Sequence, residues 1–160
     1  MKTIIMLGVI LLASGAAGEA MAACPTNASW TQVTDLVSTL TNKTACSAAG
    51  QGTQEEHHSN FELWDYKCGN NGSEPVSATC PKPASDPRSK IGRWSVAGDG
   101  TANAEVTYEY FVLGAPTETV ENTEGPFKVY TDGTHYEFCS GTASGDVFTL
   151  PATGSGRVCP

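Results

Sequence analysis

Apolar and polar residues alternate with a period of two through much of the second half of the chain. The alternation is strongest over residues 104–112, where Ala, Val, Tyr, Tyr and Val are interleaved with Glu, Thr, Glu and Phe. This pattern is typical of a β-strand that faces a core on one side. Strand signals of the same kind cover five further segments: 61–67, 93–97, 127–131, 135–139 and 146–150.

Turn residues separate several of these segments. Gly98-Asp99-Gly100 follows one predicted strand, and Asp132-Gly133 lies between two others. Asp-Gly favours a tight hairpin turn because both of its residues tolerate positive φ. The pattern therefore predicts five or six sequential antiparallel strands in a β-meander, which forms a curled sheet or a small open barrel.

One segment ahead of the strands has a helical period. Apolar residues recur there at the spacing of one helix face, at Trp30, Val33, Leu36, Val37 and Leu40. The spacing predicts one amphipathic helix over residues 29–41. The expected fold class is mainly β, with this N-terminal helix followed by the meander. Residues 69–91 hold four prolines and no periodicity, which predicts a long loop.

The first 22 residues have the layout of a signal peptide. Lys2 supplies the positive charge, residues 4–13 form an apolar run of about ten residues, and small residues follow up to Ala23. Ala20 and Ala22 place the cleavage after residue 22, which leaves residues 23–160 as one domain. No later segment approaches the ~20 apolar residues of a membrane span. A secreted or periplasmic protein is expected.

A lipoprotein signal, with Cys24 as the lipid anchor, is the alternative. The apolar run ends about ten residues before Cys24, farther than in a typical lipoprotein signal. Lipidation would also leave an odd number of cysteines in an oxidising compartment. The cleaved, unanchored form is therefore favoured.

All six cysteines follow the signal segment. An even number of cysteines in an exported chain predicts three disulfides, for which fifteen connectivities are possible. Sequential pairing is the expectation, with the bridges Cys24–Cys46, Cys68–Cys80 and Cys139–Cys159. The last bridge is expected because Cys139 lies on the more polar face of its strand and residues 151–158 are flexible enough to return to it.

The chain is acidic, with a formal net charge of −8. No Lys or Arg occurs between Arg93 and Lys128, a stretch that contains five glutamates. A surface of that sign repels phosphate groups, so nucleic acid is excluded as a partner.

The run Glu55–His58 is the one cluster that resembles a metal-ligand set, with His57 and His58 as candidate ligands. Zinc sites require three or four converging groups. Neighbours on an extended chain point to opposite faces, so at most two of these four residues share one metal. Asp65 and His135 complete a set if the strands pair suitably. Polar residues leading into a strand explain the run equally well.

Aromatic residues are concentrated on the predicted strands, where a concave sheet face lined by them forms a binding surface for an apolar ligand or a partner's side chain. The alternative is a plain aromatic core. The candidate binding residues are Trp64, Tyr66, Trp94, Tyr108 and Tyr110.

No enzyme signature accompanies these residues. The chain has neither a GxSxG nor an SxxK motif, and it has no free thiol if every cysteine pairs. The sequence therefore predicts no enzyme and no cofactor. Three functions remain open: a secreted binding module for a protein, a glycan or a small apolar ligand; a metal binder or metal-dependent enzyme that uses the Glu55–His58 run; and a secreted inhibitor that acts through the loop at 69–91.

Four short stretches carry a resemblance. QEEHHSNFELWDYKCG, DPRSKIGRWSV, VTYEY and YEFC together resemble a layout of small exported bacterial β-sheet proteins of unassigned function. Gly92-Arg93-Trp94 is similar to the Gly-x-Trp that opens a strand in lipocalin-like and avidin-like barrels, which implies ligand binding inside a barrel. Here the tripeptide opens the second predicted strand, which departs from the lipocalin order.

Overall fold

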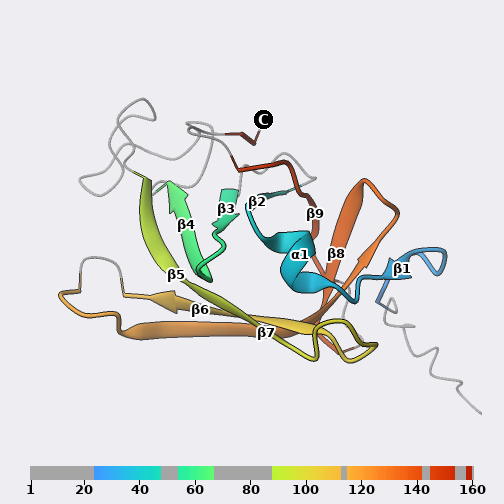
Figure 1. The fold of residues 1–160 in the computed structure, drawn as a ribbon, viewed down its shortest axis with the longest axis horizontal. Helices are drawn as coiled ribbons and strands as arrows, with labels where there is room; N and C mark the ends of the chain where they lie inside the picture. Colours follow the sequence, from blue (N-terminus) through green and yellow to red (C-terminus); the bar gives the residue numbers. More distant parts are fainter. Residues whose placement is uncertain are drawn as a thin grey trace, which may run out of the picture.

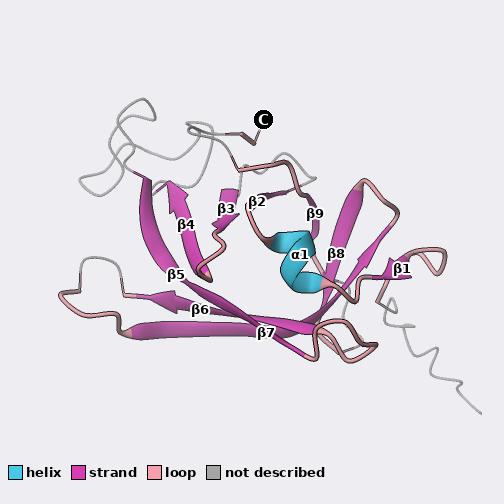
Figure 2. Cartoon of the chain, viewed as in Figure 1, coloured by secondary structure: helices cyan, strands magenta, loops and turns pink. Residues whose placement is uncertain are grey.

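The computed structural model describes residues 24–47, 54–66, 88–112, 115–141, 145–153 and 158–159. The predicted signal peptide, Cys68, Cys80 and residues 69–87 of the predicted loop lie outside these ranges. The elements of the described part, coloured by type in Figure 2, are β1 (Thr31–Gln32), α1 (Leu36–Leu40), β2 (Lys43–Ser47), β3 (Gln54–His57), β4 (Glu62–Tyr66), β5 (Arg88–Ala97), β6 (Glu105–Phe111), β7 (Val120–Thr131), β8 (His135–Cys139) and β9 (Val147–Thr149).

The strands form a closed antiparallel barrel. Each strand from β2 to β9 pairs with the next along the chain, and β9 pairs back with β2, so that eight strands close into a ring. The short strand β1 adds to the free side of β7 (Figure 1). The predicted meander is confirmed. The prediction of a curled sheet or open barrel is wrong, because β2 and β9, the two ends of the meander, form hydrogen bonds with each other and close the barrel.

The inner face of the barrel follows the alternation of the sequence. Val106 and Tyr108 of β6 are buried, as the pattern over residues 104–112 predicts. They pack with Trp94 of β5, Val129 of β7 and Phe138 of β8 into one apolar core. Burial of such side chains contributes about 1.5–3 kcal/mol each, so this core is the main source of stability.

The helix α1 fills one end of the barrel. Leu36 and Leu40 are both fully buried and belong to the same core as the strand residues. In the view of Figure 1, α1 is drawn between β2 and β7. The neighbouring turn also holds α1, because the backbone N–H of Val37 donates to the Asp99 carboxylate at 3.0 Å.

The predicted helix over residues 29–41 is wrong in its extent. Only residues 36–40 are helical, and Thr31 and Gln32 pair with β7 instead. The N–H of Val33 donates to the carbonyl of Val129 at 2.8 Å, so the backbone of this segment is hydrogen-bonded to the sheet rather than within a helix. The β-branched residues of the segment favour that outcome, because such residues lose side-chain freedom in a helix.

Several strands are longer than predicted, or were missed. β2 and β3 are built from largely polar sequence, and β5 begins at Arg88, inside the predicted loop. β7 begins at Val120 rather than at 127, because residues 120–126 pair with β6 while they remain exposed. Exposed and polar strands carry no period-two pattern, so sequence periodicity does not detect them.

Gly92 permits the close pairing of β5 and β6. A Cβ atom at this position would lie 2.2 Å from the carbonyl oxygen of Glu109. No side chain fits that space, so the glycine of the Gly-x-Trp tripeptide has a local structural role here.

Two disulfides differ from the predicted sequential pairing. Cys24 bridges to Cys139 and Cys46 bridges to Cys159, with Cα–Cα distances of 5.7 Å and 5.3 Å. The predicted bridges Cys24–Cys46 and Cys139–Cys159 are therefore wrong. The barrel explains the difference: Cys46 lies on β2, which borders the last strand, so the chain that leaves β9 meets Cys46 and not Cys139.

Residues 24–32, the N-terminal strap, run along β8 and cover it. Glu137 of β8 is fully buried, and its Oε2 accepts hydrogen bonds from the N–H and the hydroxyl of Thr26 at 2.9 and 3.1 Å. Trp30 stacks on His135 with 6.5 Å between the ring centroids. The strap explains why Cys139 is buried, although the sequence places it on the more polar face.

Within the described part of the chain, no helix has the length and apolar character that a membrane crossing requires. The two disulfides are typical of proteins in an oxidising environment.

Candidate binding site at the barrel end opposite α1

Four polar side chains on β3 and β6 share the inner face of the barrel. Glu55 and His57 alternate with Glu56 along β3, and Tyr108 and Tyr110 alternate with Glu109 along β6. Residues two apart on a strand point to the same side, which is why each pair faces inward. We call Glu55, His57, Tyr108 and Tyr110 the interior cluster.

The cluster consists of two hydrogen-bonded pairs. The Nε2 of His57 lies 3.0 Å from the Tyr108 hydroxyl, and the Tyr110 hydroxyl donates to the Glu55 carboxyl at 3.0 Å. The rings of Tyr108 and Tyr110 stack with their centroids 6.5 Å apart. Each bond joins two strands that are not neighbours in the barrel, so the pairs span its interior.

The two hydrogen-bonded pairs of the interior cluster lie at different distances from α1. Asn42, just after α1, donates its N–H to the carbonyl of His57 at 2.7 Å, so His57 marks the α1 end of β3. The pair formed by Glu55 and Tyr110 lies one step farther along both strands, toward the opposite end of the barrel.

Exposure increases in the same direction. His57 is fully buried and Tyr108 is 5% exposed, whereas Glu55 and Tyr110 are intermediate. Glu124 of β7, which is opposite Tyr108 in the β6–β7 register, is exposed. The inner wall therefore changes from dry and apolar near α1 to polar and solvent-accessible at the other end.

The surroundings shift the protonation of the cluster. Burial, with a smaller contribution from the Glu124 carboxylate, raises the pKa of Glu55 to about 7, although the Tyr110 hydroxyl opposes the shift. Burial lowers the pKa of His57 to about 4, and it raises the pKa of Tyr108 well above its usual range. At neutral pH, His57 is uncharged, both tyrosines are protonated, and Glu55 is close to half ionised.

These shifts predict opposite pH dependences of stability for the two residues. The pKa of Glu55 is higher in the folded chain than its ordinary 4.5, so its contribution is lost as pH rises from about 4.5 through 7. The pKa of His57 is lower than its ordinary 6.5, so its contribution is lost as pH falls from 6.5 through about 4. Urea denaturation of Glu55→Gln and His57→Gln across this range tests both. We expect Glu55→Gln to gain stability relative to the wild type as pH rises, and His57→Gln to gain it as pH falls. Parallel curves for all three proteins would contradict the assignment.

Three of the five predicted binding residues face the barrel interior. Trp94, Tyr108 and Tyr110 lie there. The ring of Trp94 packs edge-on against the ring of His57, with 5.5 Å between the ring centroids. The indole N–H of Trp94 is buried and has no hydrogen-bond partner among the described residues. Trp64 lies on the outer face, where its N–H donates to Glu62. Tyr66 is the last residue of β4, and its side chain is outside the described set.

The predicted metal ligands do not converge in the described part of the chain. His57 points into the barrel, whereas His58 lies 3.2 Å from Glu56 on the other face of β3. His135 is on β8, beside Asp132 and Trp30. Among the described residues, the one group of three metal-binding side chains is Cys24, Glu137 and Cys139, in which the two sulfurs form a disulfide.

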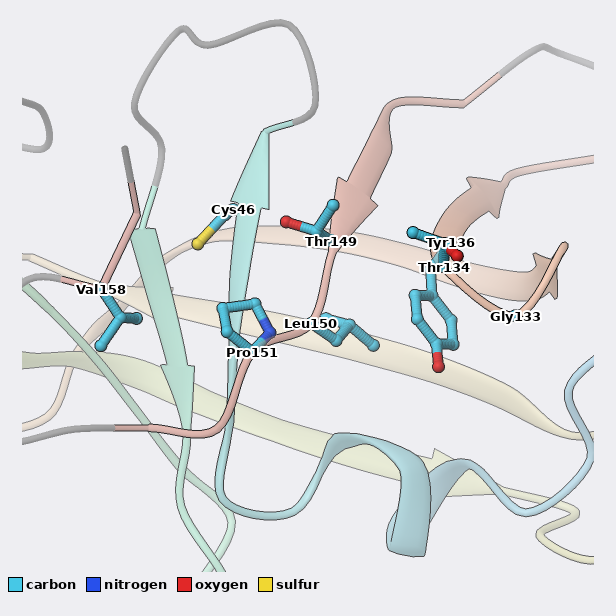
Figure 3. Close-up of a pocket in the computed structure, with 8 residues that line it drawn as sticks. All are labelled: Cys46, Gly133, Thr134, Tyr136, Thr149, Leu150, Pro151 and Val158. Atoms are coloured by element: carbon cyan, nitrogen blue, oxygen red, sulfur yellow. The ribbon is translucent and has the colours of Figure 1, made fainter.

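An open hollow of about 510 Å³ lies beside β2, β9 and the β7–β8 turn. Figure 3 shows Tyr136, Leu150, Pro151, Cys46 and Val158 among its lining residues. Among the described residues that line it, none is charged and none is a predicted binding residue. The hollow offers shape but few groups that would select a ligand.

Sequence reasoning missed the partnership of Glu55 with Tyr110 and the role of Glu124. Glu55 was identified only as part of a metal-ligand run, because its distant partner depends on the closure of the barrel. The period-two alternation of β6 was the one signal that placed Tyr108 and Tyr110 on the same face.

No known protein family, curated protein or solved structure matches this chain.

Proposed function

We propose that this chain is a non-enzymatic exported binding protein whose site is the interior cluster. The observation that supports this most is the placement of hydrogen-bonded polar groups inside the barrel. A purely structural barrel fills that position with apolar side chains, because burying a carboxyl or an imidazole costs free energy. Buried groups with strongly shifted pKa values are concentrated at functional sites.

A small ligand suits this site better than a protein or a glycan. The aromatic side chains Trp94 and Tyr108 are buried inside the barrel and so are not available to a large partner. Access is through the end where Glu55 and Tyr110 are partly exposed. Ligand sites in β-barrels commonly lie at such a mouth.

The absence of turnover is part of the proposal. The Tyr108 hydroxyl stays protonated, because burial raises its pKa. His57 is hydrogen-bonded to that hydroxyl rather than to a serine or a thiol, and so lacks the partner that nucleophilic catalysis needs. Export to the periplasm or the cell exterior accords with the predicted signal peptide and with the disulfides.

Nuclear magnetic resonance with a set of small neutral, cationic and anionic compounds tests the proposal. We expect binders to shift the resonances of β3, β6 and the first half of β7, and to be recovered unchanged after incubation. Tyr110→Phe removes the hydroxyl that contacts Glu55 and should weaken the binders about tenfold, as expected for loss of a hydrogen bond to a charged group.

Tyr130→Phe is the matched control, because Tyr130 lies on β7 and pairs with Glu137 away from the interior cluster. Shifts confined to the hollow beside Tyr136 and Leu150 would overturn the assignment of the site. Chemical conversion of a bound compound would overturn the absence of turnover.

A further inference from the structure

We infer that the ligand is a small organic cation, an amine or a quaternary ammonium ion, whose charged group is held between Glu55, Glu124 and the rings of Tyr108 and Tyr110. This inference rests on the proposed function, because it assigns a class of ligand to the same site.

Carboxyl groups dominate the charge around the cluster. Glu55 enters from β3, and Glu124 lies on β7 on the same face as Tyr108. The two are close enough that the Glu124 charge acts on Glu55. Two carboxyl groups of the described chain, Glu55 and Glu124, therefore lie near the stacked tyrosine rings.

In the described part of the chain, these two carboxyls are not paired with a cation. Neither Glu55 nor Glu124 makes an ion pair within the described residues, whereas Glu62, Glu109 and Glu118 on the outer surface all pair with Lys90 or Arg93. Lys43 lies opposite His57, at the α1 end of β2. Two carboxyls left without a cation inside one opening are complementary to a positively charged ligand.

The aromatic rings provide a second kind of contact for a cation. Tyr108 and Tyr110 are stacked, and Phe127 lies 6.1 Å from Tyr108 between ring centroids. A cation over an aromatic face gains about 0.5–2 kcal/mol, and the gain is greatest where water is excluded. Rings next to carboxylates favour an organic cation with apolar substituents over a hydrated inorganic one.

Other ligand classes fit less well. An anion would be repelled by the carboxyls. A metal ion needs several converging ligand atoms, and no such group of three is present in this part of the described barrel. A purely apolar ligand would cover the Glu55 carboxyl without providing it a partner, which costs free energy.

Cation binding must be linked to proton release. The described titratable groups around Glu55 are Tyr108 and Tyr110 of β6, Glu124 of β7 and, on its own strand, His57. Lys43 is opposite His57, farther from Glu55. No cation is among the groups that shift the pKa of Glu55. Because its pKa is about 7, only about a tenth of Glu55 is ionised one pH unit lower, so a cation must displace the proton.

Two pairs of matched compounds test the inference: choline with its neutral analogue 3,3-dimethylbutan-1-ol, and benzylamine with benzyl alcohol. Calorimetry measures the affinity of each near pH 6 and near pH 8. We expect at least one cation to bind about tenfold more tightly than its neutral analogue near pH 8, and to lose about tenfold near pH 6, while the alcohols do not change.

Glu55→Gln should abolish both the preference for the cation and its pH dependence. Glu121→Gln is the control, because it removes the same charge from β7 on the face opposite to Glu124. Two outcomes would overturn the inference that the ligand is a cation and leave the proposed site intact. One is that the alcohols bind as tightly as the cations, and the other is that Glu55→Gln still binds the cations more tightly than the alcohols. Absence of binding by all four compounds and by the wider compound set would overturn both.

Discussion

Replacing Cys24 and Cys139 together with alanine is expected to lower the free energy of unfolding by about 4 kcal/mol. The bridge joins residues separated by 115 positions. With the Cys46–Cys159 bridge intact, the loop that it closes is shorter, since only 22 residues separate Cys24 from Cys46 and 20 separate Cys139 from Cys159. A loop of that size accounts for the expected loss through the entropy of the unfolded chain.

The second bridge provides the matched control. Replacing Cys46 and Cys159 with alanine opens a loop of the same effective size, because the shortest path runs through the same two segments. Urea denaturation followed by tryptophan fluorescence should therefore show losses that agree within about 1 kcal/mol. If either double substitution lowered the free energy of unfolding by less than about 1 kcal/mol, that bridge would not constrain the unfolded chain.

Leu40→Ala is expected to destabilise the protein by about 3 kcal/mol. Leu40 is fully buried and packs into the core that joins α1 to the barrel strands. Truncation removes apolar contact and leaves a cavity in the plugged end of the barrel. A helix of five residues has almost no stability of its own, so its position depends on Leu36 and Leu40.

Ser38→Ala is the control within the same helix. Ser38 is exposed and donates only to the carbonyl of Asp35. Its replacement should change the stability by no more than about 0.5 kcal/mol. Equal effects of the two substitutions, measured by thermal or urea denaturation, would show that α1 does not anchor the core.

The sequence was most informative where one face of a strand is buried and the other is polar. Residues 104–112 and 135–139 and the turn at Asp132-Gly133 were predicted close to their observed positions. The closure of the barrel was not predictable, because it depends on the pairing of β2 with β9, two strands about a hundred residues apart. The strand at 146–150 was predicted, but β2 is largely polar and was not, so nothing local indicated that the two meet.

The cysteine pairing and the interior cluster were missed for the same reason. Short-range pairing is the natural expectation when the path of the chain is unknown, and here the closed ring brings Cys46 to Cys159. Tyr110 was identified as a candidate binding residue, but its partner Glu55 lies 55 positions away along the chain. Contacts that cross a barrel depend on its topology, which residue patterns describe only in part.

The pairing of β2 with β9 also determines when the protein can finish folding. The strands from β2 to β8 can assemble in the order in which they are synthesised, but the ring stays open until residues 147–149 are available. Until then, β2 and β8 each present an unpaired edge, which is a site for association with other chains. A topology with so late and so distant a final contact favours slow folding.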